Sequence, residues 1–313
     1  MRQSHQDEPA PPTRKACVNC RTLKSRCEGA PCTRCLSRQI PCSLSDQPRD
    51  SHPVVKSSPP EKVQHFVKLY FELFHPHWPF IHQGSFHQSN ESPLLVQSMV
   101  VLAMWATNVR SVESAAIDLH RTLDSAIQEQ REKWDASIAE TASSSCSWPL
   151  PMYQAILLHI IFSILSKGRV ALGLDLNPSI PANETSLLTS LVHSCRRLGL
   201  FYYPNMLARF HPADLVSYVW VAVEEIKRFN LALYRVCNAL SVGAGMHDGS
   251  MDMDGGWRFP ASELQFPRPG SDRLWNAVVR EEWDAAVAEG ADCIDLDDRL
   301  EAEWISRSAE SFI

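Results

Sequence analysis

The sequence predicts a small, metal-organised head followed by an all-α body. Six of the ten cysteines lie within residues 17–42, in the stretch "CVNCRTLKSRCEGAPCTRCLSRQIPC", with few apolar residues among them. From residue 62 onward apolar residues recur at helical spacing, and no convincing alternation of apolar and polar residues indicates a strand. A body of about 250 residues is large enough to bury a sizeable core.

The N-terminal residues and the lengths of the apolar runs help to decide whether these cysteines form disulfides or bind metal. The opening stretch MRQSHQDEPAPPTRK has neither the apolar region nor the cleavage site of a secretory signal, and we expect residues 1–12 to be disordered. No apolar run reaches the roughly 18 residues of a membrane span, since residues 154–165 are fewer and include His159. We therefore expect no membrane and reduced thiols, which favours a metal site over disulfides.

The cysteine spacing is a duplication of one C-x2-C-x6-C unit. The two triplets are Cys17, Cys20, Cys27 and Cys32, Cys35, Cys42. Thiolates two residues apart can bind one tetrahedral ion, and zinc is the usual occupant of a closed thiolate site. Two ions need more ligands than six cysteines supply unless two thiolates bridge both ions, and the duplication makes Cys17 and Cys32 the natural bridges. Two alternatives stay open: one zinc on the two C-x2-C pairs, or a purely structural zinc knob.

Basic residues are interleaved with the cysteines. Residues 13–42 contain seven Lys or Arg and one acid, Glu28, whereas the rest of the chain has 23 basic and 35 acidic residues. A basic head on an acidic body indicates that the head binds nucleic acid. The head has no aromatic residue on which an RNA base could stack, which favours double-stranded DNA.

The head resembles the fungal zinc binuclear cluster (Zn2Cys6) transcription factors. The double cysteine spacing, the basic stretch after the second cysteine and Pro31 before the fourth all match, although the loop between Cys27 and Cys32 is shorter than usual. The resemblance implies two zinc ions per chain and a head of two short helices with little other regular structure. The implied ligands are Cys17, Cys20, Cys27 and Cys32 for one ion and Cys17, Cys32, Cys35 and Cys42 for the other.

The resemblance also implies roles for the basic residues. A short helix after Cys20 would carry Arg21, Lys24 and Arg26 outward, and binuclear clusters place such a helix in the major groove. Lys24, four residues after the second cysteine, would read a CGG-type half-site. We expect the phosphates to be contacted by Arg14, Lys15, Arg21 and Arg26. Arg34 and Arg38 could contact phosphates in the same way or form a solvated face.

Residues 43–61 read as a flexible linker because prolines, serines and charges alternate there. No heptads indicate a coiled coil, so the choice between monomer and homodimer stays open.

The body begins at residue 62, and we assign residues 62–313 to it. One apolar stripe at helical spacing comprises Val63, Phe66, Val67, Tyr70, Phe71 and Phe74, and Pro76 stops that helix. Further helices are expected at 93–109, 114–136, 150–166, 184–198 and 212–238. The body resembles the fungal-specific transcription factor regulatory domain in residues 70–86, 92–108 and 262–283, and the end of the chain soon after Trp283 leaves open a shortened domain.

Residues elsewhere in the body do not indicate an enzyme. We expect packing roles for His75, His77 and His82, which flank two prolines and lack an acidic or thiol partner nearby. The scattered cysteines are read as small apolar core residues. They are Cys146, Cys195, Cys237 and Cys293.

The C-terminal residues 281–313 hold eleven acids and two bases. They read as the exposed helical end of the body or as an acidic segment that contacts the transcription machinery. Together these features predict a nuclear, sequence-specific regulator of RNA polymerase II genes. The alternative is a zinc-stabilised scaffold protein that does not read DNA.

Overall fold

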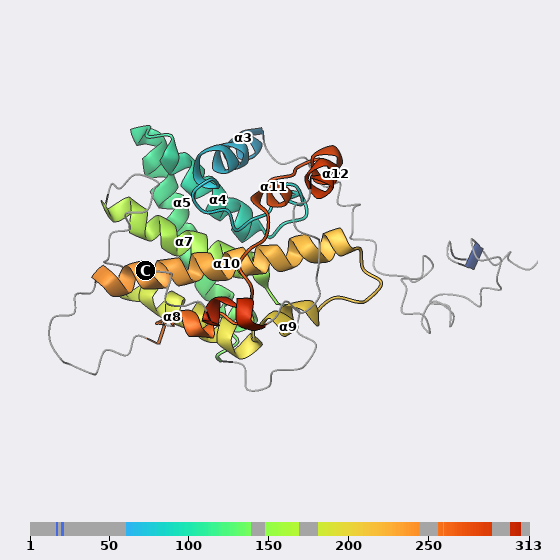
Figure 1. Cartoon of the computed structure of the whole chain (residues 1–313). Helices are drawn as coiled ribbons and strands as arrows, with labels where there is room; N and C mark the ends of the chain where they lie inside the picture. Colours follow the sequence, from blue (N-terminus) through green and yellow to red (C-terminus); the bar gives the residue numbers. More distant parts are fainter. Residues whose placement is uncertain are drawn as a thin grey trace, which may run out of the picture. The chain divides into compact units, whose positions relative to one another are not determined.

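The structure of the chain is a computed structural model. It describes residues 17, 20–21, 61–138, 148–168, 181–243, 256–258, 260–289 and 301–307. The chain divides into two units, Met1–Ser58 and Pro59–Ile313. Where the second unit is described it is built from helices, with isolated bridges and no strands, which confirms the all-α body (Figure 1).

The first predicted helix of the body changes its winding before it ends. The α-helix α3 (Glu61–Leu69) continues as a π-helix, η1 (Tyr70–Phe74), and is closed by the bond from His75 N to the Tyr70 carbonyl at 2.9 Å. Tyr70 and Phe74 of the predicted stripe are fully buried. Pro76 then ends the helical run, as the sequence predicts.

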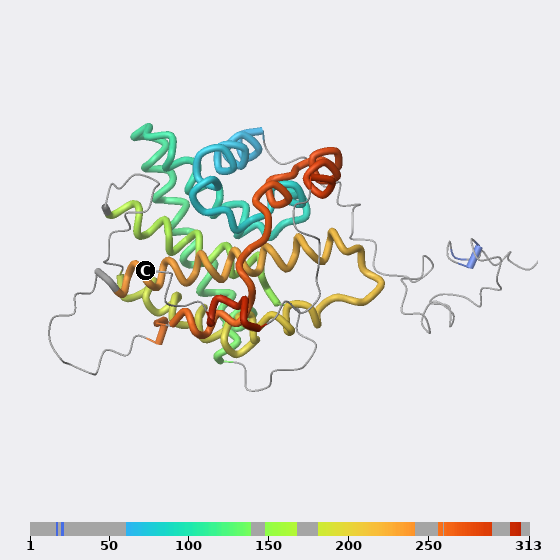
Figure 2. The backbone as a smooth tube through the Cα atoms, in the orientation of Figure 1, coloured from blue at the N-terminus to red at the C-terminus, as the bar shows by residue number. Residues whose placement is uncertain are grey.

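Three long helices form the centre of the core. Helix α4 (Pro93–Ala106) packs on both α5 (Arg110–Glu129) and α7 (Leu150–Gly168). Every residue of α7 from position 153 to 165 is buried, so this helix has no solvent face over more than three turns. Helix α10 (Val216–Gly243) packs on α7 and is the longest helix described (Figure 2).

The predicted helix 114–136 is two helices in the structure. Helix α5 ends at Glu129, Gln130 leaves helical geometry, and α6 (Arg131–Trp134) follows. The break turns Trp134 into the core, where its indole Nε1 donates to the Ile127 carbonyl at 3.0 Å. Because a helix leaves its last carbonyls without partners, Trp134 satisfies one of them at the end of α5.

The expectation that no apolar segment reaches the length of a membrane span was wrong. The window Leu150–Lys167 of α7 is long and apolar enough by composition, because the flanking residues extend the apolar run. In the structure 72% of this window is buried inside the protein. Two of its polar side chains, His159 and Ser163, contact the neighbouring helices α5 and α8, so α7 is a core helix.

Helix α8 (Ala182–Leu198) ends at Gly199, whose φ of 72° is in the left-handed region. The backbone bond from Leu200 N to the Cys195 carbonyl closes the end of the helix at 2.9 Å. The short helix α9 (Tyr203–Leu207), which the sequence analysis did not predict, follows directly.

The C-terminal segment is built from short elements. They are η2 (Ala261–Glu263), α11 (Asp272–Trp275), α12 (Arg280–Ala288), η3 (Glu301–Glu303) and η4 (Ile305–Arg307). Of these, α11 and α12 pack on α10, and η2 contacts the end of α8. Trp304 and Ile305 are buried in the main core, and Ile305 N donates to the Phe266 carbonyl at 2.9 Å. Ala286 is buried as well, so the interpretation of the acidic C-terminal region as the exposed helical end of the body was wrong at these three residues.

Candidate nucleic-acid interface and metal centre

The first cysteine pair of the head forms one tight turn together with Arg21. Cys20 and Arg21 are helical, and Arg21 N donates to the Cys17 carbonyl at 2.9 Å. Cys20 N donates to the Cys17 Sγ at 3.3 Å. Both cysteines are buried, at 0% and 1% exposure, while Arg21 is exposed.

This local geometry fits a zinc-thiolate site. Two cysteines on one tight turn are a common pair of ligands in structural zinc sites. Cys17 and Cys20 are buried, whereas Arg21 of the same turn is exposed. A cation held by the two thiolates and a basic side chain that faces solvent can therefore coexist on a single turn.

The other residues predicted for the site lie outside the described part of the chain. These are the metal ligands Cys27, Cys32, Cys35 and Cys42 and the DNA contacts Arg14, Lys15, Lys24 and Arg26, together with Arg34 and Arg38.

His75 and His82 have structural roles, as predicted, whereas His77, for which packing was also predicted, is exposed. His75 bonds through Nε2 to the Ile81 carbonyl at 2.8 Å, and His82 bonds through Nδ1 to Ser85 Oγ at 3.0 Å. Burial lowers the pKa of both rings, that of His82 to about 4. No group of three or more metal-ligating side chains occurs among the residues that the structure describes.

The two body cysteines that are described, Cys195 and Cys237, are buried core residues. Burial raises the pKa of both thiols well above the usual value. Because the thiolate is the reactive form, neither residue has the environment of a redox-sensing cysteine. Cys146 and Cys293 lie outside the described residues.

Helix α10 carries polar residues whose roles the sequence analysis missed. Glu224, only 1% exposed, accepts hydrogen bonds from Lys227 at 2.7 Å and from the backbone N of Gly270 at 2.8 Å. Arg228 pairs with Asp272 at 2.8 Å. These bonds hold the segment before α11 against α10, and the run "EEIKR" in an otherwise apolar helix was the available signal.

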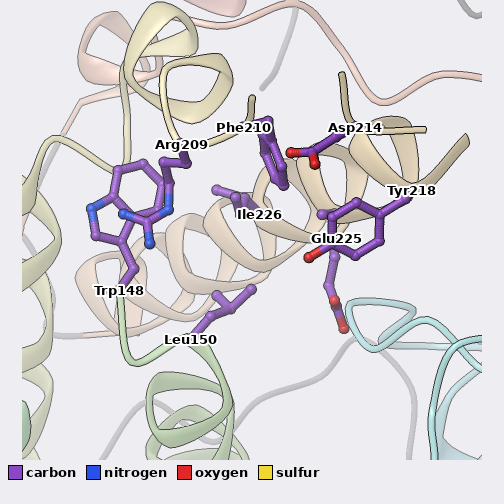
Figure 3. A pocket seen from close by; sticks show the side chains of 9 residues that line it. Trp148, Leu150, Arg209, Phe210, Asp214, Tyr218, Glu225 and Ile226 are labelled. Atoms are coloured by element: carbon purple, nitrogen blue, oxygen red, sulfur yellow. The ribbon is translucent and has the colours of Figure 1, made fainter. Parts of the chain in front are cut away.

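The neighbouring Glu225 faces a different environment. Its Oε1 accepts hydrogen bonds from the backbone N of His82 at 3.2 Å and from Gln154 Nε2 at 3.0 Å. The same side chain lines a pocket of about 330 Å³ that also includes Trp148, Arg209 and Tyr218 (Figure 3).

Two family models match the chain. The fungal Zn(2)-Cys(6) binuclear cluster domain matches residues 15–51, and the fungal specific transcription factor domain matches residues 67–205. The chain therefore joins a fungal zinc binuclear cluster to a fungal transcription factor domain. The cluster domain binds two zinc ions, and neither domain is an enzyme. The transcription factor match covers α3 to the start of α9, so it does not extend to the resemblance predicted over residues 262–283.

Curated relatives are fungal proteins of the same kind. "Zinc finger protein zas1" of Schizosaccharomyces pombe is 37% identical over 109 residues, which are 34% of this chain and 11% of that protein. "Zinc finger protein C11D3.17" of the same yeast is 35% identical over 79 residues, which are 23% of this chain and 14% of that protein. A "Transcription factor" of Gibberella fujikuroi is 23% identical over 234 residues, 73% of this chain and 27% of that protein.

The chain thus matches only about a tenth to a quarter of the length of these relatives. No solved structure matches it.

Proposed function

We propose that this chain is a DNA-binding transcription regulator that acts in the nucleus through its zinc binuclear cluster. The observation that carries the proposal is the cluster match over residues 15–51, which contains the turn with buried Cys17 and Cys20 and exposed Arg21. We assign residues 13–42 to the DNA-binding cluster, 43–61 to a linker and 62–313 to the regulatory domain. The proposed zinc ligands are Cys17, Cys20, Cys27, Cys32, Cys35 and Cys42.

The basic residues divide into two roles. Lys24, four residues after the second cysteine of the cluster, contacts guanine acceptors of a CGG half-site in the major groove, as the resemblance to zinc binuclear clusters implies. The phosphate contacts are assigned to Arg14, Lys15, Arg21 and Arg26. Phosphate contacts position the head without reading sequence, whereas the base contact discriminates between sites.

A salt titration of DNA affinity separates these roles. The full chain binds a CGG duplex and a scrambled duplex of equal length, each at several salt concentrations. We expect Lys24→Ala to cost about 1–3 kcal/mol on the CGG duplex and little on the scrambled one. The matched variant Arg14→Ala should weaken both duplexes alike and reduce the salt slope by about one unit.

Two outcomes would overturn parts of the proposal. If Lys24→Ala weakened both duplexes equally, Lys24 would be a phosphate contact and the reader would be another residue. If the unmodified chain bound both duplexes equally and weakly, the alternative of a zinc-stabilised scaffold would be favoured.

Two partner proposals extend this function. The first is a homodimer, as opposed to a monomer, and the body would have to form it because the linker sequence has no coiled-coil repeat. The second is contact between the transcription machinery and the acidic C-terminal segment. Trp304 and Ile305 are excluded from that contact because both are buried.

A further inference from the structure

The pocket beside Glu225 has aromatic walls and opposite charges at its two ends. It is lined by the segment before α7, by the turn before α10 and by the first half of α10. At one end the Arg209 guanidinium lies 4.3 Å from the centre of the Trp148 ring. At the other end lie Tyr218, Asp214 and Glu225, and Phe210 stands between the ends with its ring edge-on to Tyr218 at 5.8 Å (Figure 3).

Glu225 is a carboxylate that has hydrogen bonds but no cation beside it. Both bonds reach one oxygen, Oε1, and in the described part of the chain Glu225 forms no ion pair. The nearby Arg228 is already paired with Glu224 and Asp272.

The other titratable groups around Glu225 do not neutralise it either, and Tyr70 is kept neutral because burial and the charge of Glu225 raise its pKa. His82 and His75 are kept neutral because burial lowers the pKa of each ring, and Glu91 adds a second acid. Burial and the charge of Glu91 together raise the pKa of Glu225 to about 7. A cation that enters the pocket would favour the ionised form of this half-buried carboxyl group and pair with it.

A second, smaller cavity extends the acidic character of this wall. Its volume is about 120 Å³, and its lining shares Leu150 and Glu225 with the larger pocket and adds Glu91 and Ser85. Glu225 therefore lies at the wall of both cavities, and the lining of the smaller one contains two acids and no Lys or Arg.

We propose that this pocket binds a small organic cation, namely a protonated amine on an aromatic or apolar body. The ammonium group would pair with Glu225, and the body would lie against Phe210, Tyr218 and Ile226, where aromatic faces attract cations as well as apolar groups. The volume of about 330 Å³ is at the small end of ligand pockets, so the ligand is small. The residues of this pocket all belong to the body, and the proposal does not depend on the function proposed for the head.

Calorimetry with matched amines and alcohols tests the charge requirement. The probes are tryptamine and 2-phenylethylamine, with the neutral analogues tryptophol and 2-phenylethanol, each titrated into the full chain at pH 8. We expect saturable binding of one amine per chain, at least tenfold tighter than its alcohol. Equal affinity for amine and alcohol, or no saturable binding of either amine, would overturn the proposal.

Three variants test the location. Glu225→Gln keeps an oxygen that accepts the two hydrogen bonds and removes the charge, so it should fold and lose at least tenfold in amine affinity while alcohol binding stays unchanged. Asp118→Asn, the same change at an exposed acid on α5, should have no effect. Tyr218→Leu leaves Glu225 intact and should weaken the binding of both amines, because it removes an aromatic wall of the pocket. The variant should fold, since the Tyr218 side chain is 60% exposed and has no core role.

The pH profile gives a second readout. Because Glu225 ionises near pH 7, the affinity of the unmodified chain for tryptamine should rise about tenfold from pH 6 to pH 8, while the Glu225→Gln profile stays flat. A flat profile for the unmodified chain would show that Glu225 does not hold the amine.

Discussion

A pair of stacked histidines shows how single residues set the response of this protein to acid. His120 on α5 and His159 on α7 stack at 3.8 Å with an angle of 11° between their rings, and His120 Nε2 bonds to the His159 carbonyl at 3.1 Å. Burial and, to a smaller extent, the neighbouring His159 lower the pKa of His120 to about 4. Asp124 and Arg121 of the same helix also face this ring. Asp124 raises the pKa of His120 and Arg121 lowers it, each by less than burial does.

This environment predicts that acid weakens the body. The unfolded histidine takes up a proton near pH 6.5 and the folded one only near pH 4, so the stabilisation is complete above pH 6.5 and is lost as the pH falls towards 4. Urea unfolding at pH 7 and pH 5 measures this loss. His120→Gln should reduce the pH dependence of the free energy of unfolding by up to about 1.4 kcal/mol per pH unit. This value is an upper bound because solvent reaches part of the ring.

The comparison between variant and unmodified chain isolates His120 from other groups. His82 has the same lowered pKa and adds to the loss, whereas Glu225, whose raised pKa favours proton uptake on folding, opposes it between pH 7 and about 4.5. These contributions are common to both chains and cancel in the difference. An identical slope for His120→Gln and the unmodified chain would contradict the prediction.

At the scale of elements, the sequence predicts long periodic helices well and short irregular ones poorly. All the long helices were expected, because their apolar residues recur over several turns. The break at Gln130 was missed because it depends on Trp134 reaching a carbonyl of α5, and helices α9 and α11 were missed because four or five residues carry too little periodicity.

Of the two candidate sites, one could be predicted from the sequence and the other could not. The zinc ligands could be predicted because their spacing along the chain is itself the signal. The amine pocket could not, because Trp148, Arg209 and Glu225 come from separate segments that only the fold brings together.

Gly199 gives an element-scale prediction at the end of α8. Its φ of 72° is one that alanine adopts only with strain, and an added Cβ would overlap the side-chain amide of Asn205. We expect Gly199→Ala to lower the free energy of unfolding by about 1–3 kcal/mol in urea denaturation. Adding Asn205→Ala should recover the part of the loss that comes from the overlap.

The matched control is Gly270→Ala. A Cβ there would meet the Trp220 ring at an ordinary 3.4 Å, and Gly270 does not have a positive φ. We expect its effect to stay within about 0.5 kcal/mol. A loss at Gly270 as large as that at Gly199 would argue against strain at the end of α8 as the cause.

At the scale of the whole molecule, the two units should owe their stability to different physics. The body buries a continuous core that includes Trp78, Trp134 and Phe229, and its described residues have no metal cluster. The cysteine-rich head has few apolar residues to bury. Those between its cysteines are Val18, Leu23, Leu36 and Ile40. In such a segment metal ligation supplies the folding free energy, on the order of 10 kcal/mol per structural zinc.

Zinc removal should therefore abolish DNA binding while the body stays folded. An excess of chelator added to the full chain under reducing conditions should release about two zinc ions per chain, the number that six thiolates hold in a binuclear cluster. Binding to the CGG duplex should disappear, and the helical circular dichroism signal and the melting temperature of the body should stay unchanged. Added zinc should restore binding.

Cys17→Ala provides the control without chelator, because it removes a thiolate that the proposal places between both ions. It should lose zinc and DNA binding while the body melts at the same temperature. A body that lost its helical signal on chelation would depend on the metal directly. A release of one zinc per chain would replace the binuclear cluster with a single site on Cys17, Cys20, Cys32 and Cys35, in which Cys27 and Cys42 are spare thiols.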